Sequence, residues 1–325
     1  MRRVAGWLAV VVLVGGAPSA RAVRVTPVDN LPCPLDPAVS VRGFRKVLDN
    51  SVGGWDADLA YYGKEGQWRT FHVATCPGNL FSVYQEHLSQ PLDARQKKLV
   101  EAALVKARAK LSDPANPTVT ERHVLAAAVY EALGMPPLFL ADVWLEASWT
   151  ARDRAVGETT LLEGPAFTRR LLEAGAGELA KPLTLAQQKT VRFNLARIAH
   201  RGGYGAERDA HLAAFAALGP LSAQEQKALD IVRAVALVEE PPLQREALRR
   251  YREALAKGGL SPKETARALY LSAELQRRLG ELAEARAGFT RALAAPGLDP
   301  MHAEMARALL AELEGRPVGA PPGPQ

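Results

Sequence analysis

The spacing of hydrophobic residues divides the chain into two parts. From residue 91 to residue 314, apolar residues recur every three or four positions, which is the period of an amphipathic helix. Separate helices are predicted over residues 93–111, 121–134, 137–154, 164–180 and 184–203. Gly134 is expected to end the second of these helices, and Thr118 or Thr120 to cap its start.

Before residue 91 the pattern is that of strands and turns. Residues 67–76 alternate polar and apolar side chains, which predicts a half-buried strand that runs into a turn at Cys76. Glycines punctuate residues 51–66 and predict loops. Asp56 and Asp58 are expected to serve turn and cap chemistry there, because no longer acidic series follows to make a calcium loop. Residues 23–90 are therefore predicted to form a small β-rich module.

Three later stretches repeat a pattern of small and aromatic residues at intervals of 37 and 38 positions. They resemble the second helix of a tetratricopeptide repeat, in which small residues let helices approach and an aromatic residue fills the space between units. The predicted packing residues are Ala210, Ala214, Ala217, Ala247, Tyr251, Ala254, Ala285, Phe289 and Ala292. The expected fold is mainly α, with a right-handed, tetratricopeptide-like helical solenoid over residues 91–314 after the β-rich module. A globular helical bundle is the alternative.

Residues 1–22 have the form of an export signal. Arg2 and Arg3 precede a short apolar run, and Ala20-Arg21-Ala22 fits a cleavage site. The run is short for a permanent span, so an uncleaved anchor is the less favoured alternative. We expect export by general secretion to the periplasm or the extracellular space, with no stable membrane span after cleavage. The Pro/Gly-rich residues 315–325 are expected to form a disordered tail.

The chain has only two cysteines, Cys33 and Cys76. In an oxidising compartment, two cysteines of an exported protein favour a single disulfide. Each also begins a Cys-Pro turn in which a polar residue, Asp36 or Asn79, stands where a zinc knuckle would have its second cysteine. A zinc site and two free thiols stay open as alternatives. The ligands of such a zinc site would be Cys33, Asp36, His72 and Cys76.

Charge and motifs narrow the classes of function. The formal net charge is +6, and no basic stretch is interleaved with aromatic residues, so a nucleic-acid partner is not expected. The arginine pairs at 249–250 and 277–278 are expected on solvated helix faces. No serine-hydrolase, phosphate-loop or zinc-protease motif is present, so neither an enzyme nor a cofactor is expected. A hydrolase whose site assembles from distant residues is a less favoured alternative.

The order of motifs over residues 30–155 resembles the bacterial domain-of-unknown-function family 2225. That family has two Cys-Pro-x-Cys knuckles, an Asp- and Tyr-containing stretch between them, and a helical region similar to tetratricopeptide repeats. The matching pieces are Cys33-Pro34-Leu35-Asp36, Phe44, WDADLAYYG at 55–63, FHVATCPGNLFSVY at 71–84 and LADVWLEASWTARD at 140–153. The resemblance implies a zinc-ribbon-like module in which two of four cysteines are missing. It implies no enzymatic activity, because the family has no established one.

Taken together, these features predict an exported, non-catalytic scaffold or adaptor. A protein or peptide partner would bind to the surface of the helical repeats. Trp149, Arg152 and Asp153 are the candidate interaction surface, although packing of the small module onto the first helices is the favoured role of the tryptophan. The metal-binding protein described above is the second hypothesis. The oligomeric state is not indicated by any feature of the sequence.

Overall fold

The structure of this protein is a computed structural model that describes residues 25–46, 52–63, 67–157 and 164–316. The predicted export signal and most of the predicted tail lie outside these ranges. Helices account for most of the described residues, so the prediction of a mainly helical protein is confirmed. None of the helices in these ranges is long and apolar enough to cross a membrane.

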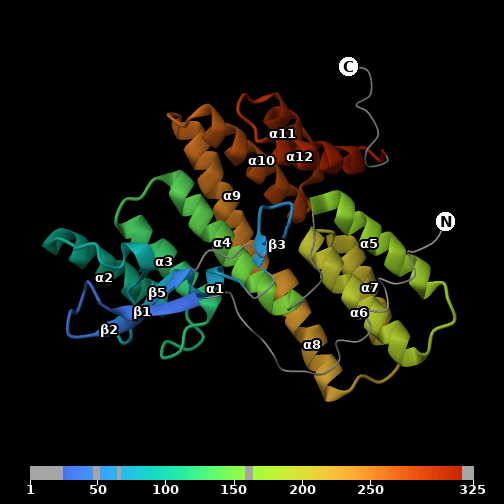
Figure 1. The fold of residues 1–325 in the computed structure, drawn as a ribbon, viewed down its shortest axis with the longest axis horizontal. Coiled ribbons are helices and arrows are strands. Elements are labelled where there is room, and N and C mark those ends of the chain that lie inside the picture. Colours follow the sequence, from blue (N-terminus) through green and yellow to red (C-terminus); the bar gives the residue numbers. More distant parts are fainter. Residues whose placement is uncertain (1–24, 47–51, 64–66, 158–163, 317–325) are drawn as a thin grey trace.

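Six short strands form three separate antiparallel pairs. The pairs are β1 (Val25–Pro32) with β2 (Ser40–Lys46), β3 (Val52–Trp55) with β4 (Tyr61–Gly63), and β5 (Val73–Thr75) with β6 (Ser82–Tyr84). Figure 1 shows β1, β2 and β5 at the left edge of the molecule, whereas β3 lies near its centre between groups of helices. The strands therefore do not form one sheet, and the hairpin β3–β4 is placed by the helices around it.

The helices begin largely where the sequence predicts them. Their bounds are α1 Arg69–His72, α2 Ala94–Arg108, α3 Val119–Ala132, α4 Pro137–Val156, α5 Gly164–Leu179, α6 Leu185–Gly202, α7 Gly205–Ala217, α8 Ala223–Ala234, α9 Glu240–Lys257, α10 Pro262–Arg278, α11 Leu282–Ala294 and α12 Pro300–Leu313. Thr118 caps α3 as expected, in a reciprocal capping box with Glu121. A π-helical turn, Val235–Glu239, joins α8 to α9.

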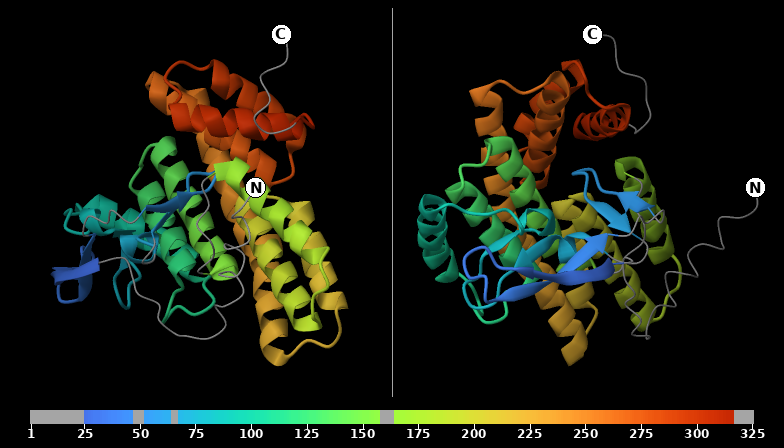
Figure 2. Two further views of the ribbon diagram at one scale, coloured as in Figure 1. Left: turned by 45° about the vertical axis from the view of Figure 1, so that its right-hand side comes forward. Right: turned by 60° about the vertical axis from the view of Figure 1, so that its left-hand side comes forward.

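The helices do not pack only on their neighbours in the sequence. Helix α4 runs along α9, although about 100 residues separate them, and this is the most extensive helix pair in the described residues. Figures 1 and 2 show α2 and α3 on one side of this pair, α5 to α7 on the other, and α10 to α12 beyond its end. In a solenoid each unit contacts only the next one. Stacking in chain order is observed over α9 to α12, and a solenoid over residues 91–314 stays a prediction.

The repeat residues behave differently in the three copies. In α9 and α11 all six are buried: Ala247, Tyr251, Ala254, Ala285, Phe289 and Ala292. In α7, Ala210 and Ala217 are exposed and Ala214 is only half-buried, so the prediction for this copy is wrong. Leu212 and Phe215 are the buried residues there, because they face α6 and α8 in a separate core. Because α7 is rich in alanine, the alignment of the three copies matched alanines on its solvent-facing side instead of the residues on its buried side.

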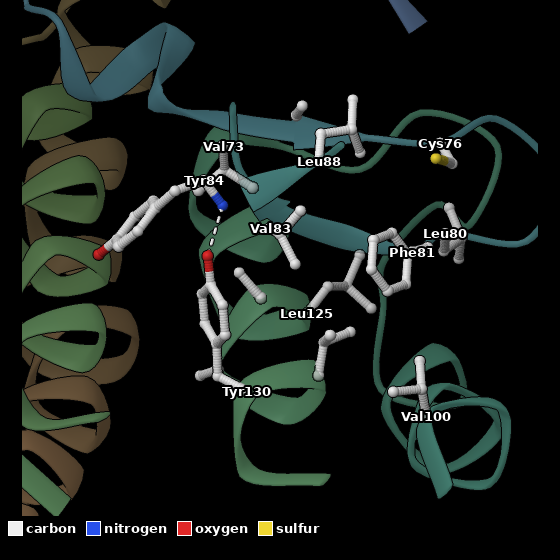
Figure 3. Packing of buried hydrophobic residues seen from close by; sticks show 14 of the residues in the cluster. Val73, Cys76, Leu80, Phe81, Val83, Tyr84, Leu88, Val100, Leu125 and Tyr130 are labelled. Atoms are coloured by element: carbon white, nitrogen blue, oxygen red, sulfur yellow. Dashed lines mark hydrogen bonds between the residues drawn. The ribbon is translucent and has the colours of Figure 1, made fainter. Parts of the chain in front are cut away.

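The N-terminal strands share their core with the first helices. Figure 3 shows side chains from β5, β6 and the turn between them packed against residues of α2 and α3. The hydroxyl of Tyr130 in α3 accepts a hydrogen bond from the backbone N–H of Tyr84 at 2.8 Å. Ala57, beside β3, belongs to a different core with α9 to α12. The predicted module of residues 23–90 thus has no core of its own.

The strand predicted over residues 67–76 is only partly present. Arg69 to His72 form the short helix α1, and the strand β5 covers Val73 to Thr75 alone. The helical turn places the guanidinium of Arg69 against Asp153 of α4, with two hydrogen bonds of 2.7 Å. The partly buried ion pair with the distant helix α4 thus outweighs the local alternation of polar and apolar residues, which favours a strand.

Candidate functional site

The hairpin β3–β4 carries two aspartates into the interior of the molecule. Asp56 and Asp58 lie in the turn between the strands, and both are fully buried. Asp58 accepts from the backbone N–H of Ala60 at 3.4 Å, as the expected turn chemistry requires. Their main partners, however, are arginines of three different helices. These residues form what we call the central ionic cluster: Asp56, Asp58, Arg152, Arg201, Glu240, Glu274, Arg277 and Arg278.

Arg152 of α4 lies at the middle of this cluster. Its guanidinium contacts Asp58, Asp56 at 3.2 Å and Glu240 at 2.8 Å, and its side chain has no exposed area. Arg201 of α6 donates to Asp56 at 2.8 Å. Burial alone would raise the pKa of Asp58, but Arg152 and Arg278 outweigh burial and hold the pKa well below its usual range. The aspartate is therefore ionised at neutral pH.

Helix α10 supplies the remaining charges. Arg277 donates to Glu274 at 2.7 Å, and Arg278 donates to Glu274 at 2.8 Å. The two arginines are almost fully buried, so the expectation that this pair lies on a solvated face is wrong. Four guanidinium groups thus meet four carboxylates in a region closed to solvent. The cluster can fix the hairpin among the helices, because its side chains are buried and paired with one another.

The predicted interaction surface is mostly interior. Arg152 is buried in the central ionic cluster, and this contradicts its assignment to a binding surface. Asp153 is partly exposed but is occupied by Arg69. Trp149 is half-buried and packs against the core that contains α9 to α12. The three residues lie within five positions of one another on α4. Their side chains contact different neighbours, so they do not form one patch.

The two cysteines form a disulfide, which confirms the favoured prediction. The Cys33–Cys76 S–S distance is 2.06 Å, and both residues are fully buried. Closing a loop of this length contributes about 3–4 kcal/mol to stability in the chain-entropy model. The alternative zinc site is not assembled, because both sulfurs are bonded to each other. Among the described residues no group of three or more His, Cys, Asp and Glu side chains could hold a metal ion.

Asp36 and His72, the other two candidate zinc ligands, are engaged elsewhere. The side chain of Asp36 accepts from the N–H of Ala38 at 3.1 Å, whereas His72 contacts α4. Its Nδ1 lies 2.9 Å from Glu146 of α4, its Nε2 lies 3.3 Å from the exposed Glu86, and its ring stacks on Tyr84 at 3.8 Å between centroids. Burial alone would lower the pKa of His72, but the hydrogen bonds to Glu146 and Glu86 outweigh it and raise the pKa to about 9. A charged His72 therefore ties α1 to α4 at neutral pH.

A groove of about 580 Å³ lies beside the disulfide, between the strands β2 and β5 and the loop that precedes α3. Its apolar wall includes Val41 and Phe44 of β2, and Phe71 and Val73 beyond them. Gln85 bridges the two sides at one end, because its side-chain oxygen accepts from the N–H of Phe44 and its nitrogen donates to the carbonyl of Phe71. Each strand has a hydrogen-bonded strand partner on one edge only.

The turn after β5 forms the floor of the groove and is held tightly. Cys76 N–H donates to the carbonyl of Phe81 at 2.8 Å, and the side chain of Asn79 accepts from the N–H of Phe81 at 2.9 Å. Gly78, with φ +80°, sits at the exposed tip of this turn. A second hollow of about 430 Å³ shares Pro77, Gly78 and Arg108 with the groove, so the concave surface continues past the turn.

Three arginines line the groove: Arg42 of β2, Arg108 at the end of α2, and Arg122 in the first turn of α3. None of them forms an ion pair with another described residue. The Nε atom of Arg122 is buried and has no hydrogen-bond partner. Burial lowers the pKa of Arg122, and no neighbouring carboxylate opposes this effect. No Asp or Glu is found among the described residues that line the groove.

Sequence reasoning missed both regions for the same physical reason. Asp56, Asp58 and the arginines of the central ionic cluster come from segments up to 222 residues apart, and no local spacing relates them. Arg42, Arg108 and Arg122 are likewise dispersed. The WDADLAYYG stretch offered one signal, since two aspartates between large aromatic residues are unusual for an exposed loop.

The chain matches no protein-family model, no curated protein and no solved structure. The resemblance to family 2225 therefore stays a prediction, and a functional proposal has to rest on the geometry of this chain.

Proposed function

We propose that this protein is an exported, non-catalytic adaptor that binds an extended peptide segment of a partner protein. The observation that carries the proposal is the groove between β2, β5 and the start of α3, which combines an apolar wall with the buried Nε of Arg122, a hydrogen-bond donor that has no partner. Small-molecule and peptide sites commonly join apolar walls to a few polar groups that orient the ligand. The groove replaces the helical-repeat surface as the expected contact region.

The strands at the groove favour an extended ligand. β2 and β5 are each paired on one edge, and an extended peptide can add to such an edge through main-chain hydrogen bonds. The disulfide supports export, because such bonds persist mainly in oxidising compartments. The buried carboxylates Asp56, Asp58, Glu240 and Glu274 are paired with arginines in the central ionic cluster.

A displayed random-peptide library tests the proposal. The mature chain, residues 23–325, would be used for selection, and hydrogen exchange would locate each selected peptide. We expect slower exchange in residues 41–44 and 73–76 on binding. Selection of no peptide, or protection confined to another surface, would overturn the proposal.

Two matched variants sharpen this test. Ala115 and Ala213 are both exposed alanines, but only Ala115 lines the groove. Ala115→Trp should obstruct the groove and weaken peptide binding about tenfold or more, whereas Ala213→Trp on α7 should leave the affinity unchanged. Equal effects of the two variants would show that the peptides do not use the groove.

A further inference from the structure

The groove differs from every other charged region described above in having cations without anions. Arg42, Arg108 and Arg122 form no ion pair with a described residue, and no described Asp or Glu lines the groove itself. Asp36 and Glu101 line the adjoining hollow that Arg108 also borders, so Arg42 and Arg122 are the two arginines that line only the groove without a carboxylate. The buried Nε of Arg122 is the strongest sign, because a buried donor without an acceptor destabilises the protein, and more so when it is charged. A ligand that brings an acceptor to this position would remove that cost.

We infer that the groove selects peptide segments with acidic side chains, and that Arg122 is the main specificity-determining residue. The inference rests on the proposed function, because it assigns the chemistry of the ligand in the same groove. A guanidinium binds a carboxylate through two parallel hydrogen bonds, which are stronger than those between neutral groups. The partly buried position of Arg122 strengthens this contact, since the pair is less screened by water.

The groove places charged and apolar side chains in one lining. Arg122 lies at the loop side, Arg42 on β2, and Arg108 at the point where the second hollow begins. The apolar residues Val41, Phe44 and Phe71 lie in the same groove. In an extended peptide, successive side chains point to opposite faces. A segment that alternates acidic and apolar side chains can therefore present its acidic face to the arginines and its apolar face to the apolar wall.

Three synthetic peptides of equal length test the inference. They would keep the apolar residues of a peptide selected in the library experiment and carry Glu, Gln or Lys at all other positions. We expect the Glu peptide to bind about tenfold or more tightly than the Gln peptide, and to lose this advantage as the NaCl concentration rises. The Lys peptide should bind most weakly. Fluorescence anisotropy of labelled peptides measures all three affinities.

Arg122→Gln should remove most of the preference for Glu over Gln, and Arg122→Lys should restore it in part, because lysine keeps the charge without the planar fork. Arg192→Gln is the matched control. Arg192 on α6 also has a buried Nε without a partner, but it does not line the groove. Thermal unfolding verifies that each variant is folded, and Arg108→Gln at the exposed end of α2 provides a second variant.

The outcomes separate the two proposals. Equal affinities for the Glu and Gln peptides, with protection in the groove, would overturn the acidic preference and leave the peptide-binding function in place. A preference for Glu that survives Arg122→Gln and Arg108→Gln would also overturn it. If the library yields no peptide that protects the groove, the peptide-binding function itself fails, and the acidic preference fails with it.

Discussion

Two arginine-rich regions of this protein have opposite arrangements. In the central ionic cluster, four buried guanidinium groups face four carboxylates from the β3–β4 turn, α9 and α10. In the groove, three guanidinium groups form no ion pair with a described residue, and the nearest lining carboxylates, Asp36 and Glu101, belong to the adjoining hollow at Arg108. The comparison shows that the number of arginines says little about their role. Whether the fold supplies their counter-charges decides if they serve the structure or remain open to a ligand.

The cost of burying charge explains why the central ionic cluster is complete. Moving an ion out of water costs several kcal/mol, and this is offset only when the ion is paired and hydrogen-bonded in good geometry. Arg152 meets that condition through Asp58, Asp56 and Glu240. Two of the groove arginines, Arg42 and Arg108, do not carry this cost of burial because they stay exposed to water. Arg122 is the exception, and it is therefore the residue on which the comparison depends.

The largest effect is expected from removing one charge of the central ionic cluster. Asp58→Asn leaves Arg152 and Arg278 short of a buried counter-ion, and we expect a loss of about 3–5 kcal/mol in the free energy of unfolding. Denaturation with urea measures this loss. The control is Glu314→Gln, which breaks an exposed pair with Arg316 and should cost at most about 1 kcal/mol. A small effect of Asp58→Asn would mean that the hairpin does not depend on the cluster.

A smaller effect, and one that depends on pH, is expected from the partly buried pair of His72 and Glu146. The pKa of His72 is raised from 6.5 to about 9 in the folded protein, so its stabilisation is complete below pH 6.5 and is lost as the pH rises through 9. The loss should be on the order of 2–3 kcal/mol.

Urea denaturation at several values between pH 6 and pH 10, for the wild type and for His72→Gln, checks this dependence. The two stability curves should converge as the pH rises. Glu314→Gln is the control, because Glu314 forms an exposed pair with Arg316 and has no contact with His72, so it should change the curve only slightly. Curves of the wild type and His72→Gln that run parallel over this range would contradict the raised pKa.

The smallest change in stability is expected at Arg122. Arg122→Leu removes a partly buried cation that has no partner, so the free energy of unfolding should stay the same or rise by up to about 1 kcal/mol. Arg152→Leu, measured beside it, should be strongly destabilising. A loss of more than about 2 kcal/mol at Arg122 would assign it a structural role and remove the contrast between the two regions.

Features that depend on neighbouring residues were predicted well. Thr118 and Glu121 form the expected cap, Gly134 follows α3, and the copies of the repeat in α9 and α11 bury the residues that the alignment selects. Features that depend on a distant partner were predicted poorly. Residues 69–72 of the predicted strand form α1, where Arg69 reaches Asp153. Arg278 is buried against Asp58 of the hairpin, and Arg277 is buried against Glu274 of its own helix and the carbonyls of Gly202 and Gly203 in α6 and its cap.

The sequence by itself determined the mainly helical class, the positions of most helices and the pairing of its two cysteines, since periodicity, capping and the count of cysteines are local or compositional properties. Only the tertiary structure decided which charges are neutralised and which are left open. The reason is physical: the free energy of a charge depends on the burial and counter-charges around it, and these come from segments that the chain order does not relate.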